Sequence, residues 1–292
     1  MKVAVTGGNG YLGTALKTEL LRQDQAEVLS LTIDQVPPEE HTFTDFSVES
    51  LTEQFRGVDV VVHLAAVRGG TGIGDFSDNE RITENLLLAM RNAGVKRFVF
   101  SSSIAVYSDT SRIPWREDQP CQPVSLYGIS KLACEALFHY YARNNGFSGC
   151  ILRFAPVYGE HDRNRRMIAN FIRQAKEGQP LTVNGKSTAK RDFIYRDDVI
   201  QALKWAVFSS GNTVETYNIG SGEPLTNLEI ATAVTQAFHS PQAVHYLEDQ
   251  PETMPPAYSD ITKARQAGFS PDYTMASALE RIVKLENDND LS

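Results

Sequence analysis

The amino-acid sequence predicts an α/β fold, a doubly wound parallel sheet with a smaller, interleaved C-terminal domain. Apolar strand-like segments alternate with helical patterns over the first half of the 292 residues, and the pattern becomes mixed after Phe154. A glycine-rich turn joins the first strand to the first helix. Strands that are apolar on both faces and separated by helices form parallel sheets covered on both sides. Right-handed crossovers then make the Rossmann arrangement the simplest topology.

The predicted elements of the first half follow one another in βα order. The predicted strands are short apolar runs, namely Lys2–Thr6, Val28–Thr32, Val58–Leu64, Phe98–Phe100 and Cys150–Phe154. The predicted helices repeat apolar residues every three or four positions, namely Gly10–Leu21, Ser47–Phe55, Glu80–Asn92 and Tyr127–Arg143. The strand Phe98–Phe100 runs into Ser101-Ser102-Ser103, which places hydroxyl groups at a strand end.

The second half predicts shorter elements and a second domain. Its expected helices are Met167–Lys176, Asp197–Phe208, Leu228–Phe238 and Ala276–Leu285, and its expected strands are Leu181–Val183, Asp192–Tyr195 and Thr216–Ile219. The helix Asp197–Phe208 is long enough to return to the sheet of the first domain. We therefore expect a cofactor-binding domain formed by residues 1–154 plus about 190–215, and a substrate domain formed by about 155–189 and 216–292.

Composition and charge exclude several classes of function. The formal net charge is −8 and the sequence contains no block of like charges, which argues against nucleic-acid binding, since that needs a basic face. Cys121, Cys134 and Cys150 fit no zinc spacing, and the histidines form no ligand pattern, so we expect reduced thiols and no metal. The chain begins with a strand instead of a signal peptide, and no apolar run has membrane-spanning length. We expect a soluble, cytoplasmic protein without a membrane partner.

The glycine turn Thr6–Gly13 predicts a dinucleotide site. Gly7 permits a tight turn, Gly10 lets a pyrophosphate approach the backbone, and Gly13 lets the helix pack closely on the strand. The helix N-terminus then presents its positive dipole end to the phosphates. The alternative is a turn that only connects two elements, but the strand, turn and helix occur in the order that the dinucleotide motif requires.

Asp34 closes the second predicted strand, 21 residues after Gly13. An acid at this distance hydrogen-bonds the hydroxyl groups of the adenosine ribose. Its charge repels a 2′-phosphate, so the sequence favours NAD over NADP. The alternative for Asp34 alone is a solvated loop acid.

Tyr127 and Lys131 open a predicted helix and share one of its faces, because they lie four residues apart. A free phenol ionises at about pH 10, too high for a base at neutral pH. A neighbouring ammonium and the positive ring of an oxidised nicotinamide both favour the phenolate. Taken alone, the Tyr127–Lys131 pair also fits an ordinary contact between two side chains of one helix. Together with the glycine turn, it predicts hydride transfer to or from a nicotinamide.

Ser103 leaves the carboxyl end of a strand, where doubly wound sheets bind their ligands. We expect its hydroxyl to bond a substrate oxygen and to present it to Tyr127. For Ser101 and Ser102 the stronger alternative is that they satisfy backbone groups near the strand end.

These motifs resemble the extended short-chain dehydrogenase/reductase family, and within it the NAD-dependent nucleotide-sugar epimerases and dehydratases. The further matching segments are Asp45-Phe46, His63-Leu64-Ala65-Ala66, Asn79 with Thr83, Arg153–Gly159 and Arg191–Val199. The resemblance implies catalytic roles for Ser103, Tyr127 and Lys131, and substrate contacts for Ser103, Tyr127 and Arg191. The cofactor-binding residues that it implies are Gly7, Asn9, Gly10, Tyr11, Leu12, Gly13, Asp34, Asp45, Phe46, Leu64, Ala65, Ala66, Asn79, Ser101, Tyr127, Lys131 and Phe154.

The sequence departs from the family pattern in its loop Arg68–Asp78, which is short and rich in glycine, and at two further places. Pro156 stands where the family usually carries an asparagine whose amide contacts the sugar nucleotide. Many relatives also carry an arginine shortly before an Asp-x-x-Lys-Ala segment, whereas residues 250–258 contain none. The basic loop that holds Arg163, Arg165 and Arg166 offers substitute positive charge, with a solvated loop as the alternative.

The residues after Ser103 bear on the reaction. Dehydratases of this family carry an Asp-Glu pair there, whereas this chain has Ile104-Ala105, and neither side chain transfers protons. The resemblance then implies 4-epimerisation of a nucleoside-diphosphate sugar. Tyr127 takes the proton of the sugar O4 while the C4 hydride moves to NAD, and the transient 4-keto sugar turns over before the hydride returns.

Other functions and one assembly state stay open on the sequence. An NAD-dependent sugar or uronate dehydrogenase, or a ketoreductase, would use the same three residues but release reduced cofactor. A non-catalytic NAD-binding regulatory protein would keep the fold without needing a tuned base. The resemblance also implies a homodimer through Glu80–Asn92 and Tyr127–Arg143, unless both helices only cover the sheet. Neither the sugar nor the nucleotide follows from the sequence.

Overall fold

The computed structural model describes residues 1–22, 26–34, 40–67, 69, 72, 74, 76–162 and 166–289. The chain forms two compact units. The first comprises Met1–Ser108, Glu117–Phe154 and Ile200–Asn218, and the second comprises Asp109–Arg116, Ala155–Val199 and Ile219–Ser292.

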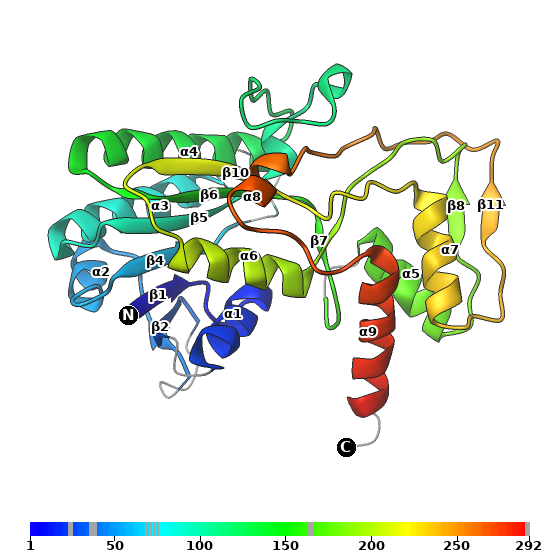
Figure 1. The fold of residues 1–292 in the computed structure, drawn as a ribbon, viewed down its shortest axis with the longest axis horizontal. Helices are drawn as coiled ribbons and strands as arrows, with labels where there is room; N and C mark the ends of the chain where they lie inside the picture. Colours follow the sequence, from blue (N-terminus) through cyan, green and yellow to red (C-terminus); the bar gives the residue numbers. More distant parts are fainter. Residues whose placement is uncertain are drawn as a thin grey trace. The chain divides into compact units, whose positions relative to one another are not determined.

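Within the described residues, the first unit is built on a seven-stranded sheet of order β10-β6-β5-β4-β1-β2-β3 (Figure 1). The strands are β1 (Lys2–Thr6), β2 (Glu27–Thr32), β3 (Thr42–Phe43), β4 (Val60–His63), β5 (Arg97–Ser103), β6 (Ser148–Phe154) and β10 (Val214–Ile219). β1 pairs in parallel with both β2 and β4, so the strand order reverses at β1. The predicted doubly wound Rossmann sheet is confirmed, and ligands of such sheets bind at the carboxyl ends beside the reversal.

Helices cover both faces of this sheet. They are α1 (Tyr11–Leu21), α2 (Val48–Gln54), α3 (Ser77–Ala93), α4 (Leu126–Asn145) and the part of α6 (Arg196–Phe208) from Ile200 onward. Figure 1 shows α2, α3 and α4 on one side and α1 with α6 on the other. The side of α2, α3 and α4 holds a buried core that includes Phe55, Leu87, Phe98 and Phe138. Burial of these large side chains is the main stabilising contribution of this unit.

The start of α4 is fixed by a serine cap, which matters because Tyr127 lies in its first turn. Ser125 is the N-cap, and its hydroxyl accepts a hydrogen bond from the Gly128 N–H at 3.1 Å. The helix ends at Gly146, whose φ of 64° is in the left-handed region that glycine adopts without strain. An N-cap serine such as Ser125 stabilises a helix by about 1 kcal/mol.

The second unit contains α5 (Met167–Lys176), α7 (Asn227–Ala237), α8 (Thr262–Gln266) and α9 (Met275–Asn289). Its short strands pair in parallel as β7 (Val157–Tyr158) with β9 (Ile194–Tyr195), and β8 (Thr182–Asn184) with β11 (His245–Leu247). Its buried core draws on α5, α7 and α9, with Phe171, Val234 and Leu279 among its members. The sequence did not predict β3, β7 or β11, because such short strands show no period-two pattern, whereas β9 lies within the predicted strand Asp192–Tyr195.

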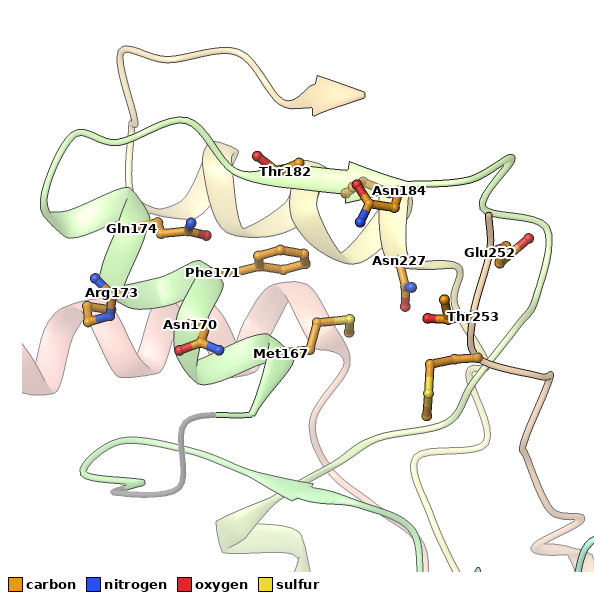
Figure 2. A pocket seen from close by; sticks show the side chains of 12 residues that line it. Met167, Asn170, Phe171, Arg173, Gln174, Thr182, Asn184, Asn227, Glu252 and Thr253 are labelled. Carbon is orange, nitrogen blue, oxygen red and sulfur yellow. The ribbon is translucent and has the colours of Figure 1, made fainter. Parts of the chain in front are cut away.

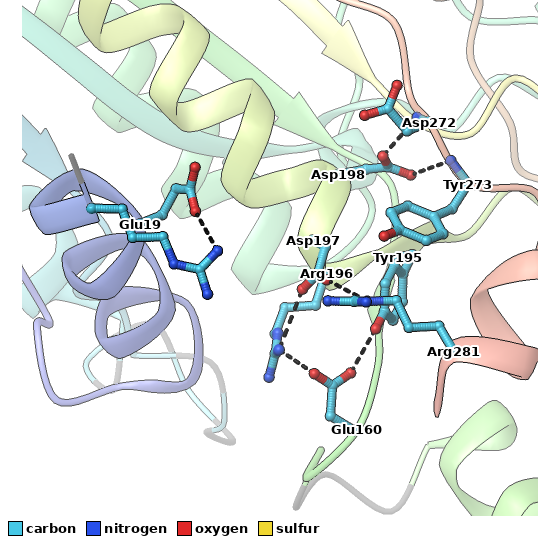
Figure 3. Close-up of polar contacts among 10 residues, drawn as sticks. Glu19, Glu160, Tyr195, Arg196, Asp197, Asp198, Asp272, Tyr273 and Arg281 are labelled. Atoms are coloured by element: carbon cyan, nitrogen blue, oxygen red, sulfur yellow. Dashed lines mark hydrogen bonds and ion pairs between the residues drawn. The ribbon is translucent and has the colours of Figure 1, made fainter. Parts of the chain in front are cut away.

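A polar cluster surrounds the first turn of α6 in the second unit (Figure 3). The Glu160 carboxylate accepts hydrogen bonds from the Tyr195 hydroxyl at 2.9 Å and from Arg196. Arg281 Nε donates to Asp197 at 2.9 Å. Acidic side chains are favoured at a helix N-terminus by its dipole, and the two arginines match their charge here.

Within the described part of the chain, no helix combines the length and the apolar composition that a membrane crossing requires. In the same residues, no cluster of three or more His, Cys, Asp or Glu side chains is arranged to hold a metal ion.

Candidate active site

The glycine turn between β1 and α1 forms a tightly packed cradle. Gly7 has a φ of 67°, and a Cβ atom there would lie 2.9 Å from the Ala65 backbone nitrogen. A Cβ atom at Gly13 would lie 2.1 Å from the Gly7 carbonyl oxygen. Gly10 is the N-cap of α1 and brings no side chain to its first turn. The turn therefore offers the positive end of a helix to a pyrophosphate that approaches the backbone.

Asp34 follows β2 and is held in a closed set of hydrogen bonds. Asn9 Nδ2 donates to Asp34 Oδ2 at 2.5 Å, and the Thr32 hydroxyl donates to Asn9 Oδ1 at 2.9 Å. The Asp34 N–H donates to Thr32 Oγ1 at 3.1 Å. The exposed carboxylate is thus fixed beside the glycine turn, where a ribose hydroxyl can donate to it.

The side chain of His63, at the end of β4, links the end of β1 to α3. The Thr83 hydroxyl donates its hydrogen to the Asn79 carbonyl at 2.7 Å, so His63 Nε2 must donate to Thr83 Oγ1 at 3.2 Å. His63 Nδ1 is then the acceptor for the Thr6 hydroxyl at 2.7 Å. Burial lowers the pKa of His63 to about 3, so the ring stays neutral at physiological pH.

Asn79, in the first turns of α3, clamps the loop that follows β4. Its Oδ1 accepts from the Val67 N–H at 2.7 Å, and its Nδ2 donates to the Val67 carbonyl at 3.1 Å and to Ser130 Oγ at 2.9 Å. The loop of Leu64, Ala65 and Ala66 therefore lies between this clamp and Thr6, whose Oγ1 accepts the Leu64 and Ala65 N–H groups. Both amide hydrogens of Asn79 are used in holding protein groups.

Asp45 and Phe46 follow β3. The exposed Asp45 carboxylate accepts the Ser47 N–H at 2.9 Å, and this hydrogen bond lowers the pKa of Asp45. Phe46 has a φ of 56° and its ring is buried in the core, while its carbonyl accepts from Asn85 Nδ2 at 2.8 Å. The pair is fixed by these contacts, and its place beside an adenine stays a prediction.

Lys131 is a desolvated cation next to a phenol. It is 2% exposed, and its Nζ donates to the Ser101 carbonyl at 2.7 Å. The ammonium lies 4.8 Å from the Phe100 ring centroid and 5.8 Å from the Tyr127 ring centroid. Tyr127 itself is partly exposed. The structure therefore brings the predicted pair together, with the cation inside and the phenol accessible.

The three serines occupy the last positions of β5 and have different partners. Ser101 Oγ donates to the His63 carbonyl at 2.8 Å, and Ser102 Oγ donates to the buried Glu135 carboxylate. Ser103 Oγ accepts the Ala105 N–H at 3.1 Å and caps a short 3-10 turn, Ile104–Val106. That bond leaves the hydroxyl hydrogen of Ser103 available to a substrate oxygen. Phe154 pairs with Ser103 across the β5–β6 ladder.

Arg191 belongs to the second unit, where its backbone pairs with Leu225 and Ala257. Its guanidinium carbon lies 5.2 Å from the Phe193 ring centroid. Among the described residues, the guanidinium has no carboxylate or hydrogen-bond partner. Burial lowers the pKa of Arg191, since the charged form has lost water without gaining an anion. Such a cation suits an anionic ligand.

Asp192, the neighbour of Arg191, is used inside the second unit. It is buried and accepts the Ser221 N–H at 3.2 Å, the Ser221 hydroxyl and the Gly222 N–H at 3.3 Å. Burial raises the pKa of Asp192. A Cβ atom at Gly220 would lie 2.1 Å from Asp192 Oδ2, so the loop needs a glycine there.

A pocket of about 470 Å³ lies between α5, β8 and residues 252–254 in the second unit (Figure 2). It is lined by Met167, Asn170, Phe171, Arg173, Gln174, Thr182, Val183, Asn184, Asn227, Glu252, Thr253 and Met254. Asn227 Oδ1 is buried and has no hydrogen-bond partner in the described part of the chain. Asn227 follows Leu225, the bridge partner of Arg191, by two residues, which span at most about 7 Å. Asn227, a lining residue of the pocket, is therefore close along the backbone to the bridge that holds Arg191, which does not itself line the pocket.

The chain between Ser103 and Tyr127 contains a strap that the sequence did not reveal. Residues 109–116 belong to the second unit, where the Trp115 N–H donates to the Tyr258 carbonyl at 3.1 Å and the Asp260 N–H donates to the Trp115 carbonyl at 2.8 Å. Trp115 is 5% exposed, and its Nε1 donates to the Asp109 carbonyl at 2.8 Å. The signal available in the sequence was Trp115 itself, a large aromatic residue in a segment without helix or strand periodicity.

The NAD dependent epimerase/dehydratase family model matches residues 3–220. The chain belongs to this family. The resemblance to the nucleotide-sugar epimerases and dehydratases is thereby confirmed, and so is NAD as the cofactor, because solved relatives contain it. The site fits NAD, since Gly10 brings no side chain to the start of α1, where a pyrophosphate would approach, and the exposed Asp34 carboxylate is held by Asn9 of the same turn.

Proteins similar to this chain include nucleotide-sugar 4-epimerases. UDP-N-acetylglucosamine 4-epimerase from Bacillus cereus is 37% identical, with a TM-score of 0.92 over 98% of this chain and 99% of that one. UDP-glucuronic acid 4-epimerase from Bacillus cereus, solved with UDP-glucuronic acid and NAD, is 28% identical with a TM-score of 0.84, over 99% of this chain and 100% of that one. A putative UDP-glucose 4-epimerase from Methanocaldococcus jannaschii is 29% identical over 98% of this chain and 99% of its own length.

The departures from the family pattern have structural counterparts. Pro156 uses its carbonyl to accept the Ile194 N–H at 3.0 Å, which begins the pairing of β7 with β9. Of the basic loop, Arg166 is the exposed N-cap residue of α5, whereas Arg163 and Arg165 lie outside the described residues. Residues 250–258 contain no arginine, and Arg191 is a half-buried cation of this unit that has no carboxylate partner among the described residues.

Proposed function

We propose that this family member is an NAD-dependent 4-epimerase of a UDP-sugar, which acts through a transient 4-keto intermediate. The observation that carries the proposal is the buried Lys131 ammonium, 5.8 Å from the ring centroid of the partly exposed Tyr127. The pair places an accessible phenol next to a buried ammonium that is fixed by the Ser101 carbonyl, an arrangement that suits a proton-transferring tyrosine.

Three residues of the first unit carry the proton chemistry in this proposal. Tyr127 takes the proton from the sugar 4-hydroxyl and later returns it. Lys131 stabilises the phenolate and is itself fixed by the Ser101 carbonyl. Ser103 donates its hydroxyl hydrogen to the sugar O4 and keeps that oxygen in line with Tyr127. When bound, NAD supplies the hydride acceptor and donor. The glycine turn and the Asn9–Asp34 pair would hold it.

Two features of the second unit support a nucleoside-diphosphate substrate. Arg191 is a cation without an anion among the described residues, so we assign it to the diphosphate. The pocket offers the Phe171 ring, several amide side chains and the unpartnered Asn227 Oδ1 (Figure 2), a set that suits a nucleobase. An anchored diphosphate leaves the 4-keto sugar free to turn over, as an epimerase requires.

The turn after Ser103 favours epimerisation over dehydration. Relatives include a dTDP-glucose 4,6-dehydratase from Haemophilus influenzae, 27% identical over 97% of this chain and 97% of its own length. In this chain Ile104 is buried and Ala105 has no titratable group, so neither side chain can move the proton that the elimination of water requires.

The test is incubation of the purified protein with a panel of UDP- and dTDP-hexoses, with NMR readout of the products and absorbance readout of NADH. We expect conversion between 4-epimers without accumulation of NADH. Tyr127→Phe is expected to reduce kcat at least about 1,000-fold while NAD binding stays intact, because only the proton acceptor is lost. Steady NADH release would establish the dehydrogenase alternative, and unchanged turnover by Tyr127→Phe would refute the assignment of the base.

We also propose a homodimer through α3 and α4. Ile129 and Tyr140 on α4 are 43% and 63% exposed, so α4 presents apolar and aromatic surface that a second copy can cover. Light scattering at micromolar concentration tests this, and a monomeric mass would contradict it.

A further inference from the structure

Glu135 has no role in the chemistry described above, yet it is one of the most deeply buried acids of the chain. It is 2% exposed. It follows Lys131 by four residues and Tyr127 by eight on α4, so the three side chains share one helix face. At a rise of 1.5 Å per residue, Glu135 lies about 12 Å along the helix from Tyr127.

Successive turns of α4 are attached to successive residues of β5. Lys131 Nζ bonds the Ser101 carbonyl, and the Glu135 carboxylate accepts the Ser102 hydroxyl. Two attachments at different heights fix both the distance and the rotation of the helix relative to the strand. The next residue of that strand is Ser103.

Glu135 also binds the neighbouring strand β6. Arg153 donates to its carboxylate through Nε at 3.0 Å and through Nη2 at 2.6 Å, a bidentate ion pair. Arg153 is the direct partner of Ser102 in the parallel ladder, and the following pair is Ser103 with Phe154. The carboxylate thus spans both strands one residue before the candidate site.

The same ion pair reaches the turn that comes after Ser103. Arg153 Nη1 donates to the Tyr107 hydroxyl at 2.7 Å, and that hydroxyl donates to Asn218 Oδ1 at 2.9 Å. Tyr107 closes the 3-10 turn that Ser103 caps. Ser103 is therefore held from both sides by groups that depend on Glu135.

The 3-10 turn Ile104–Val106 packs directly against the start of α4. A Cβ atom at Gly128 would lie 2.2 Å from the Ala105 carbonyl oxygen, so the first turn of α4 touches the backbone of the turn directly. Tyr127 precedes Gly128, and Ser103 precedes the contacted turn by one residue. A shift of α4 against β5 would change the separation of their hydroxyl groups.

We propose that Glu135 is a positioning residue, which together with Arg153 sets the placement of the Ser103 hydroxyl relative to the Tyr127 hydroxyl. This inference rests on the proposed roles of Tyr127 and Ser103 in the epimerisation. In this proposal the Glu135–Arg153 ion pair affects kcat. Arg191 contributes to the affinity for the nucleotide, and the glycine cradle contributes to the affinity for NAD.

The test compares four variants with the parent protein on the UDP-sugar that the parent epimerises: Glu135→Gln, Glu135→Leu/Arg153→Met, Glu160→Gln and Tyr127→Phe. For Glu135→Gln we expect kcat to fall about 10- to 100-fold, because a misplacement of about 1 Å can cost that much. KM and the Kd of NAD should stay within about threefold. Tm is recorded for every variant.

The double variant separates positioning from stability. Leucine and methionine remove both charges and leave no uncompensated ion, so its Tm should lie closer to that of the parent than the Tm of Glu135→Gln does. Its kcat should stay as low as that of Glu135→Gln, since Ser102 and Tyr107 have lost their fixed partners. Glu160→Gln is the matched control. It removes a buried carboxylate paired with an arginine in the second unit, and should lower Tm with kcat kept within about threefold.

Each outcome either supports or overturns the positioning role of Glu135. A parent-like kcat in Glu135→Gln or in the double variant overturns the proposal, and so does a rise in KM at constant kcat. If Glu135→Gln does not fold, the double variant alone gives the answer. A parent-like kcat in Tyr127→Phe overturns the proposed function itself. Loss of activity in Tyr127→Phe with full activity in Glu135→Gln removes only the positioning role.

Discussion

Arg153 in the first unit is buried and Arg191 in the second is half-buried, but only Arg153 has a counter-ion among the described residues. Burial disfavours the charge of Arg153, yet the hydrogen bonds and the negative charge of Glu135 outweigh it and raise the pKa of Arg153. Arg191 faces the Phe193 ring and has no carboxylate partner among the described residues, so burial lowers its pKa.

The presence or absence of a counter-ion distinguishes a charged side chain that stabilises the fold from one that is suited to binding a charged ligand. Removing one member of a buried ion pair leaves the other uncompensated, which is costly to the fold. A cation without a partner costs the fold free energy until an anion arrives, so the bound anion recovers that cost. The network around Arg153 therefore stabilises the molecule, whereas our proposal assigns Arg191 to ligand binding.

Arg153→Met should show the largest effect on stability. It leaves Glu135 buried without a cation, and we expect the free energy of unfolding to fall by about 3 to 5 kcal/mol. Urea denaturation followed by circular dichroism measures this change. A loss below about 1 kcal/mol would mean that the pair is not the stabilising element described here.

Arg191→Met should show the opposite profile. We expect the Kd of UDP to rise about 100-fold, because two charge-assisted hydrogen bonds of about 1.5 kcal/mol each are lost. Tm should be unchanged or higher, because the desolvated cation has gone. Isothermal titration calorimetry and thermal unfolding measure the two quantities. A clear drop in Tm together with unchanged UDP affinity would reverse the comparison.

Added UDP should stabilise the parent protein and not the Arg191→Met variant. At a UDP concentration of 100 times the parent Kd, linkage gives about 2.7 kcal/mol of extra stability. The variant, measured at the same UDP concentration, should gain less than about 0.5 kcal/mol. Equal shifts of Tm in the two proteins would place the diphosphate elsewhere.

Asp198 extends the comparison to a carboxylate and should give the smallest effect. It accepts the Asp272 N–H at 2.7 Å and the Tyr273 N–H at 3.3 Å (Figure 3), and has no ion-pair partner in the described ranges. Burial raises the pKa of Asp198 to about 6. The folded protein therefore holds this proton more tightly than the unfolded chain does, so the stabilisation is full below about pH 4 and is lost as the pH rises through 6.

The comparison variant for this titration is Asp198→Asn, which cannot ionise. The unfolding free energy of the parent relative to this variant should fall by about 1 kcal/mol between pH 5 and pH 7. Urea denaturation of both proteins at the two pH values measures it. A difference that does not change with pH would show that Asp198 keeps an ordinary pKa.

The sequence by itself determined the sheet, the cofactor and the pairing of Tyr127 with Lys131. Each of these depends on local spacing: apolar runs, glycines around a helix start, and two side chains four residues apart. The predicted helix Met167–Lys176 has the bounds that the structure shows. The serine run was expected to follow a strand, whereas β5 continues through Ser103 because β6 pairs with it to that residue.

Only the tertiary structure decided which charges are neutralised. Glu135 and Arg153 lie 18 residues apart, and their contact depends on how α4 packs on the ladder of β5 and β6. The residues around Arg153 do not show that it has a counter-ion, because the carboxylate that pairs with it comes from α4. The strap at Trp115 and the clamp of Asn79 on Val67 likewise join segments that meet only after folding. The periodicity of apolar residues predicts the geometry of a single helix or strand. A counter-ion comes from a different element, and the sequence pattern does not show how the two elements pack against each other.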